Sequence, residues 1–331
     1  MNGLLVRVAV ESDLPEVATL LGGGRPAPQL PAPGAGSELL LVAAATSVDP
    51  GAARLLGCLR LRDSIGLGRP RYSYHVGCAV HAAADLGLFH RQRTLLLGND
   101  HTGASELADL ACAVDGLPLA LQSGSLRLLV HSALLLVASR RGQYAAQIVA
   151  ELPGRRDSAG QSPFWDGLGR HFYSGDPAQA AERFGADWRS HVASLLPRQL
   201  VYASFLTTAA QSAIAQVSDA ARLQRDVLEE AGLIYDHHVG IDDGGPVLEA
   251  AIDALGPVQA ARRLRVQGAA SGHGVAARLP YLVLRDAAST PPRAARLLGS
   301  AVDGALRLDD AQMAMLGLAS GDTVWAHALR G

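Results

Sequence analysis

The longest apolar run of this chain extends from Leu126 to Ala138, and it limits strongly what the 331 residues can fold into. Arg127 and His131 interrupt the run, which is shorter than the roughly 20 residues that a membrane-spanning helix needs. The pattern predicts a long apolar helix over residues 125–139, followed by a strand over 147–152. We therefore expect a soluble protein without a membrane contact.

Composition excludes several functional classes. Hydrophobic residues make up 49% and charged residues 18%, which excludes a disordered chain. The net charge of -2 provides no global field for nucleic acid or for an anionic membrane surface. Cys58, Cys78 and Cys112 are widely spaced, so neither a disulfide framework nor a metal site is indicated. The N-terminus lacks a secretory signal pattern, and we predict a cytoplasmic protein.

The order of predicted elements favours an α/β (α+β) fold. A strand and a short helix to about residue 21 come first, followed by a Pro/Ala/Gly connector over 25–36 that predicts a loop. Two strands joined by a turn at residues 49–51 then predict an antiparallel meander. The strands predicted before the apolar helix cover residues 4–10, 39–45, 55–62, 72–81, 93–97 and 107–114.

The second half is richer in predicted helices, and its tail is richer in short strands. The predicted helices cover residues 177–184, 186–195, 203–217, 219–231 and 308–316. The predicted strands cover residues 233–235, 247–252, 275–284 and 323–329. This distribution predicts a small β-rich appendage at the C-terminal end.

A dense polar segment, Asn99–Glu106, lies between two apolar strands. Loops between rigid strands often carry a functional site, because the strands position polar groups that water and ligands can reach. The same composition is also typical of a well-capped surface turn. The residues of this segment by themselves leave both interpretations open.

Five segments occur in the order and approximate spacing of the arginine N-succinyltransferase family, and the chain resembles that family on them. They cover residues 72–81, 97–107 (Leu-Gly-Asn-Asp-His-Thr-Gly-Ala-Ser-Glu-Leu), 161–173, 201–206 and 241–249. The tail from Ala311 also looks similar. The resemblance implies an acyltransferase of the general N-acyltransferase (GNAT) kind, with a mixed, largely antiparallel sheet and flanking helices.

The resemblance also implies an organisation and a reaction. We expect a GNAT-like, acyl-CoA-binding half over residues 1–160 and a second α/β half over 161–260 that completes the active site, with the β-rich appendage over 261–331. The implied enzyme moves a succinyl group from succinyl-CoA to the α-amine of L-arginine without a bound cofactor, as a homodimer or with a homologous subunit. Two alternatives remain: an acyl-CoA transferase for another amine such as ornithine, and a catalytically impaired subunit that pairs with an active homologue.

For the donor, the resemblance implies two strands that splay apart and a succinyl-CoA contact at Leu110. The pyrophosphate loop of the fold corresponds to residues 119–125, where Ser123, Gly124 and Ser125 could present N–H groups to a phosphate. The same three residues could instead form an ordinary N-cap of the helix that follows.

For proton transfer, the histidine that acts as acid in the family corresponds to Ser218. A serine hydroxyl donates a hydrogen bond but has no pKa near neutrality. His101 is our first candidate to take over proton transfer, and His81 is the second. The adjacent pair His237–His238 replaces other residues of the family. For each histidine, a solvated or hydrogen-bonded structural role is the alternative.

For the acceptor, we predict Asp100 and Glu106 as anchors of a guanidinium group, because a carboxylate pairs with it in bidentate geometry. Asp242 and Asp243 could serve likewise, or could belong to a tight turn. Tyr74, in the first matched segment, is a further predicted substrate contact. The connector over 25–34 departs from the family, so the identity of the acceptor is the least determined property.

Overall fold

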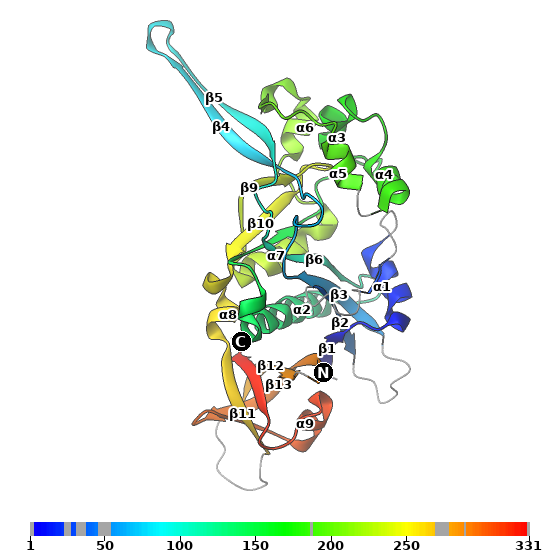
Figure 1. Cartoon of the computed structure of the whole chain (residues 1–331), viewed down its shortest axis with the longest axis vertical. Helices are drawn as coiled ribbons and strands as arrows, with labels where there is room; N and C mark the ends of the chain where they lie inside the picture. The colour runs from blue at the N-terminus through cyan, green and yellow to red at the C-terminus, as the bar shows by residue number, and fades with distance from the viewer. Residues whose placement is uncertain are drawn as a thin grey trace.

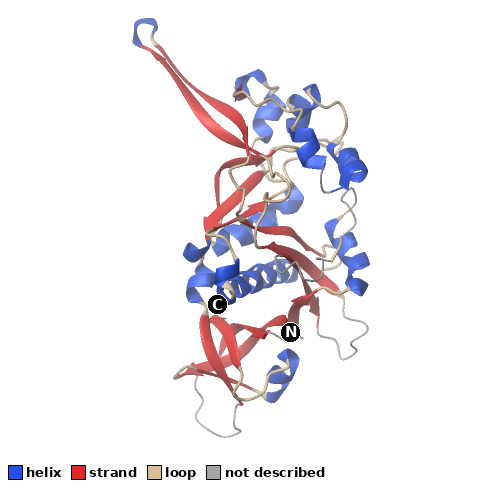
Figure 2. Cartoon of the chain, in the orientation of Figure 1, coloured by secondary structure: helices blue, strands red, loops and turns tan. Residues whose placement is uncertain are grey.

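The computed structural model describes residues 3–22, 28–30, 38–45, 54–185, 188–268, 278–287 and 289–329. One twisted sheet passes through most of the molecule, with helices packed along it (Figures 1 and 2). The predicted turn at residues 49–51 and most of the predicted connector over 25–36 lie outside the described residues.

Fifteen strands pair within the described residues, in the order β12-β15-β11-β14-β13-β1-β2-β3-β6-β7-β10-β9-β4-β5-β8. All of these pairs are antiparallel except β6–β7 and β11–β14. The strands are β1 (Leu4–Val8), β2 (Glu38–Ala45), β3 (Leu55–Arg62), β4 (Ser73–Ala83), β5 (Leu88–Gly98), β6 (Ser105–Cys112), β7 (Gln147–Glu151), β8 (Val201–Tyr202), β9 (Ile234–Gly240), β10 (Pro246–Ala251), β11 (Arg262–Gly268), β12 (Leu279–Ala287), β13 (Thr290–Val302), β14 (Ala305–Leu308) and β15 (Thr323–Ala328). The mixed, largely antiparallel sheet that we expected is therefore present.

Helix α2 (Leu119–Ser139) is the central helix of the molecule and connects the parallel strands β6 and β7. It packs against strands β2, β3 and β6 and against α7 (Arg222–Ala231) and α8 (Gly256–Ala260). By length and composition it is apolar enough to cross a membrane, but 61% of its most apolar window is buried inside the protein. Burial from several sides accounts for its uniformly apolar sequence.

The hairpin of β4 and β5 projects from the body (Figure 1). Its two strands pair along their whole length, from Ser73 opposite Gly98 to Ala83 opposite Leu88. At their inner ends β4 pairs with β9 and β5 with β8. Strands that precede residue 160 therefore share a sheet with strands that follow it.

A small group of helices covers the sheet near the base of this hairpin. It comprises α3 (Pro163–Gly167), α4 (Pro177–Phe184), α5 (Trp188–Ala193) and α6 (Thr208–Ala213). The single helix predicted over 203–217 is wrong: a 3-10 turn at Ala203–Phe205 precedes α6, and Thr207 caps α6 through its side chain. The chain turns away at Ala215, which has a φ of 61° and donates its N–H to Gly244 O.

The C-terminal strands form a closed ring, because β12 pairs with both β15 and β13 while β11 and β14 complete the circuit. Buried aliphatic side chains, including Val266, Val283 and Leu306, fill it. Helix α9 (Asp310–Leu316) begins at an Asp309 capping box. The predicted β-rich tail is thus observed, although β11, β13 and β14 were not predicted. In β13, two prolines and two arginines obscure the strand pattern.

Candidate active site

The site lies where the parallel strands β6 and β7 separate. Their pairing is limited to Ser105 with Ile148 and Glu106 with Val149, after which β6 stays with β3 and β7 with β10. The β3–β6 register shifts between Cys58 and Arg60, opposite Asp109, whose φ is 51°. A bulge of this kind bends a strand and changes where its groups point.

Two carboxylates of these strands, buried Glu106 and half-buried Glu151, lie within a network of arginines. Glu106 is 1% exposed and forms ion pairs with Arg62 and, at 3.1 Å, with Arg71. Glu151 forms ion pairs with Arg71 and, at 2.8 Å, with Arg189. Burial would raise the pKa of Glu151, but Arg189 and Arg71 outweigh it and lower that pKa to about 2. Glu151 is therefore held as an anion by two guanidinium groups.

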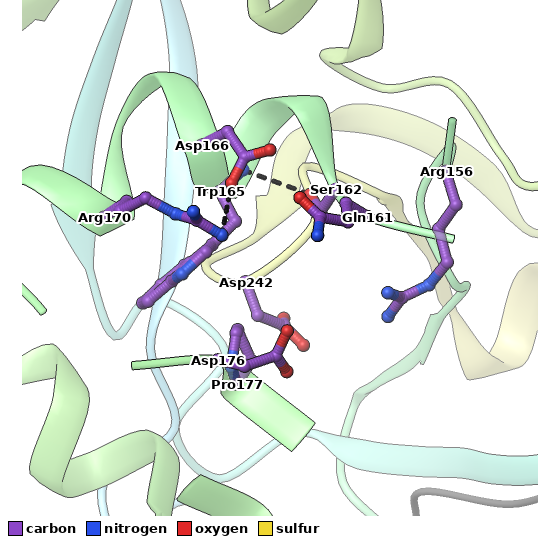
Figure 3. A pocket seen from close by; sticks show the side chains of 9 residues that line it. All are labelled: Arg156, Gln161, Ser162, Trp165, Asp166, Arg170, Asp176, Pro177 and Asp242. Carbon is purple, nitrogen blue, oxygen red and sulfur yellow. Dashed lines mark hydrogen bonds and ion pairs between the residues drawn. The ribbon is translucent and has the colours of Figure 1, made fainter. Parts of the chain in front are cut away.

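Glu106 and Glu151 line a shallow pocket that opens to solvent. The other lining residues are Ile65, Arg71, Tyr72, Ser73, His101, Val149 and Val247. A second shallow pocket, shown in Figure 3, contains the ion pair of Arg170 with Asp166. Asp242 lines this second pocket and accepts from Arg189 at 3.1 Å.

The segment Asp242–Pro246 is a tight turn between β9 and β10, as one of our two interpretations predicted. Gly240 N–H donates to Gly245 O at 2.8 Å across it. The Asp243 carboxylate accepts from Gly154 N–H at 2.7 Å and from Gly245 N–H at 2.9 Å. Burial, with Asp242 adding to it, raises the pKa of Asp243 to about 7. Asp243 therefore braces the turn, so its prediction as a substrate anchor is wrong.

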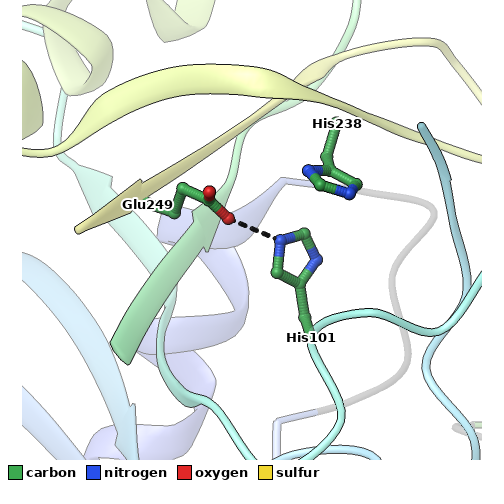
Figure 4. Close-up of side chains that lie close together, drawn as sticks. All are labelled: His101, His238 and Glu249. Carbon is green, nitrogen blue, oxygen red and sulfur yellow. Dashed lines mark hydrogen bonds and ion pairs between the residues drawn. The ribbon is translucent and has the colours of Figure 1, made fainter. Parts of the chain in front are cut away.

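His101 forms the second part of the site. Its ring is buried, and Nε2 lies 2.7 Å from Glu249 Oε2 (Figure 4). His238 packs against it with ring centroids 4.4 Å apart, and His238 Nε2 lies 3.1 Å from Asp100 Oδ2. A histidine that is oriented by a carboxylate at the wall of a pocket has the arrangement of a general base.

Two other predicted residues do not reach this pocket. Tyr74 is fully buried in the core against Phe164, and its hydroxyl has no hydrogen-bond partner. Burial raises the pKa of Tyr74, and the side chain offers nothing to a substrate, so its prediction as a substrate contact is wrong. His81 lies on the exposed β4–β5 hairpin with its ring 5.9 Å from that of Tyr202.

The residues predicted for the donor lie on β6 and α2. Leu110 follows the bulge at Asp109 and is half-buried against the main core. Ser123, Gly124 and Ser125 lie inside α2 and form neither a loop nor an N-cap, because the helix already begins after Pro118. Ser125 Oγ donates to Leu121 O at 2.8 Å. Their N–H groups belong to the helical hydrogen bonds, so their prediction as a phosphate loop is wrong.

The exposed start of α2 carries the available N–H groups instead. Leu121 and Gln122 both donate to Pro118 O, which leaves the N–H groups of Leu119 and Ala120 outside the helical ladder. Ser218 lies beside the segment that follows β7, and its N–H donates to Pro153 O at 2.8 Å. It is half-buried and precedes a short 3-10 turn.

Sequence reasoning missed Glu151, Glu249, Arg71 and Arg189. A signal was present for Glu249, which is a charged residue inside an otherwise apolar strand, and for Glu151, which ends an apolar run. The sequence analysis also predicted no metal site. In the structure, however, His101, His238 and Glu249 place three ligand atoms within 4.8 Å of one another. None of these pairings follows from local sequence, since the partners are far apart in the chain.

Comparisons with known proteins identify the family of this chain. The family described as "Arginine N-succinyltransferase beta subunit" matches residues 38–256. An arginine N-succinyltransferase of Enterobacter sp. is 34% identical over 270 residues, which cover 82% of this chain and 76% of that protein. One of Salmonella paratyphi B is 34% identical over 268 residues, covering 81% and 76%.

A solved structure shares the fold. It is the arginine/ornithine succinyltransferase subunit AI of Pseudomonas aeruginosa, which aligns over 100% of both chains with a TM-score of 0.78 and 24% identity. The resemblance that the five segments indicated is confirmed by these matches.

Proposed function

Because this chain belongs to the arginine N-succinyltransferase family, we propose that it transfers a succinyl group from succinyl-CoA to the α-amine of L-arginine. The observation that carries the proposal is the pocket beside the separating strands, where two buried carboxylates and a carboxylate-oriented histidine meet. Such a pocket offers anchors for a cationic acceptor and a group that removes its proton.

Glu106 and Glu151 are the proposed anchors of the acceptor. Both already contact the guanidinium of Arg71, so their oxygens stand at distances that suit this group. Arginine and carboxylate form charge-assisted, often bidentate hydrogen bonds, which favour arginine over a neutral amino acid. Asp100, which is exposed and pairs with His238, is a weaker anchor.

His101 is the proposed general base. The α-ammonium group must lose a proton before its nitrogen can attack the thioester, and the imidazole of His101 lies on the pocket wall. Glu249 fixes the ring at 2.7 Å and stabilises the imidazolium that forms. A positioned base of this kind contributes typically 10²–10⁴-fold to the rate.

The donor side follows the GNAT arrangement in this proposal. The bulge at Asp109 and the separation of β6 from β7 leave backbone groups near Leu110 to bind the thioester carbonyl and the oxyanion. The N–H groups of Leu119 and Ala120 at the start of α2 suit the pyrophosphate. Ser218 is proposed to donate a hydrogen bond to the departing thiolate.

A second acceptor has a specific observation in its favour. The Pseudomonas aeruginosa relative is described as an arginine/ornithine succinyltransferase subunit. Ornithine also carries a cationic side chain that the same two carboxylates could hold. Pairing with another subunit and a cytoplasmic location belong to the proposal as well. All three cysteines lie in described residues and none forms a disulfide, which suits a reducing compartment.

The test is the release of free thiol from succinyl-CoA by the purified chain with arginine or ornithine. The variant His101→Gln should lower kcat roughly 10²–10⁴-fold. The matched control His81→Gln, on the exposed hairpin, should retain the wild-type rate. An unchanged rate in His101→Gln would remove that residue from the mechanism. Absence of turnover with every amine, together with tight association with an active homologue, would favour the impaired subunit.

A further inference from the structure

We propose that His101, His238 and Glu249 form a binding site for a divalent cation of the zinc type, and that occupation of this site blocks the proposed base. The three residues come from the loop after β5, from β9 and from β10. Their ligand atoms lie within 4.8 Å of one another, and Figure 4 shows the two rings and the carboxylate converging.

A backbone irregularity directs His238 toward the other two residues. The β9–β10 register shifts so that Val247 faces His238 while Leu248 already faces Tyr235. Asp236 and His237 are therefore extra residues of β9, and His237 has a φ of 62°, which is strained for a side chain of this kind. Bulges of this type re-aim side chains and are common beside functional sites.

The contacts of His238 hold its ring beside the other two residues. Its Nδ1 lies 3.0 Å from the carbonyl oxygen of Asp236, which only accepts, so this contact requires a hydrogen on Nδ1. Its Nε2 lies 3.1 Å from Asp100 Oδ2. A hydrogen on Nε2 or a metal ion bound to Nε2 satisfies this second contact, and the metal ion is the case that we propose.

The donor set selects the kind of metal. Two imidazoles and one carboxylate suit zinc and not magnesium or calcium, which prefer oxygen ligands. Tetrahedral zinc with bonds of about 2.0–2.2 Å places its ligands roughly 3.3 Å apart, so the 2.7 Å contact of His101 with Glu249 must widen slightly. Three protein ligands leave a fourth position, which Asp100 or a water can occupy.

The site and the proposed base share one ring. A metal on His101 Nε2 would occupy the nitrogen that now contacts Glu249. The single hydrogen of the neutral ring would then be on Nδ1, which would have no lone pair to accept a proton from the acceptor. Zinc should therefore inhibit succinyl transfer, and this consequence rests on the proposed function. Binding of the metal does not rest on it. His238 contacts the proposed base, so inhibition of His238→Gln is compared with the zinc-free rate of the same variant, and removal of His238 should abolish the inhibition on that scale.

Titration calorimetry of the purified full-length chain with zinc chloride tests the site. We expect one site per chain, with affinity at least tenfold lower in His238→Gln and in Glu249→Gln. The matched control His237→Gln, an exposed neighbour, should bind zinc like the wild type. Cobalt(II) should give a visible absorption band that disappears in His238→Gln but persists in His237→Gln.

The activity arm separates the two proposals. Zinc should inhibit the wild type at the concentrations that saturate calorimetry and should spare His238→Gln. Binding without inhibition would support the site and remove His101 as base. Equal zinc affinity in the wild type and His238→Gln would overturn the site, as would absence of zinc binding with both His238 nitrogens protonated in nitrogen-15 NMR spectra.

Discussion

Two clusters of titratable side chains in this protein lie away from solvent and differ in whether they carry charge. In the network around Glu106 and Glu151, the buried carboxylates pair with arginines. Between α2 and β15, by contrast, the rings of His131 and His327 lie 5.5 Å apart, and both nitrogens of His131 are buried without a hydrogen-bond partner. In the first cluster, opposite charges pair with each other. In the second cluster, the imidazole of His131 is neutral.

The difference is expressed in the pKa values. Burial alone would raise the pKa of Glu151, yet its arginine partners lower it to about 2. Burial, reinforced by His327, lowers the pKa of His131 to about 4. The cluster with paired charges lies at the pocket, where a charged ligand can replace one of the arginine partners. A cluster that stays neutral suits the contact between the central helix and the C-terminal ring.

The largest effect should follow from removing the compensation at the pocket. Glu151→Gln leaves Arg71 and Arg189 without one carboxylate partner, and we expect a loss of about 3–5 kcal/mol in the free energy of unfolding. Urea denaturation at pH 7 measures it. The contribution of Glu151 is present above its usual pKa of 4.5 and is lost as the pH falls toward 2. A loss below 1 kcal/mol would show that the network is not coupled.

A smaller, pH-dependent effect should come from the neutral pair. The unfolded chain protonates His131 near its usual pKa of 6.5 while the folded chain resists until about 4, so stability falls as the pH drops between them. At pH 5 the wild type should lose up to about 2 kcal/mol from this residue. His131→Leu should remove that part of the slope. Urea midpoints at pH 7 and pH 5 measure the slope, and an identical slope in both proteins would contradict the assignment.

The smallest effect should come from an ion pair outside both clusters. Arg225 and Glu229 pair at 2.8 Å on the solvent side of α7, four residues apart. Glu229→Gln should cost about 0.3–0.5 kcal/mol, because solvent screens such a pair. The same urea experiment at high salt should reduce even this difference. A cost comparable to that of Glu151→Gln would erase the distinction between buried and exposed pairs.

Much of the fold could be predicted from local patterns. The strands β2, β3, β4, β6 and β7 and the helix α4 were predicted close to their observed bounds, because apolar alternation and helical spacing are local signals. Strand β5 was predicted over 93–97 but begins at Leu88. The failures were of two kinds. Pro and Arg residues hid β13, which tertiary pairing with β1 and β12 nevertheless stabilises. Helix α2 began six residues earlier than predicted, at Leu119 instead of Ser125, which converted the expected phosphate loop into helix.

The site was predicted in part, for the same reason. His101 and Glu106 lie in one polar segment and could be identified together. Their partners Glu249, Glu151 and Arg71 could not be paired with them, because those contacts join residues that are far apart in the chain. Tyr74 and Asp243 carried suitable chemistry but are enclosed by packing and by a turn.

The sequence by itself determined the family, most secondary structure and the polar segment that supplies His101, because these depend on residue types at short or fixed spacing. Only the tertiary structure decided which charges meet. The separation of β6 from β7 and the irregular pairing of β9 with β10 bring those groups together. Arg189 forms ion pairs with both Glu151 and Asp242. A buried charge without a partner is costly, so each one must be paired in the folded chain. No local sequence pattern shows which partner it has.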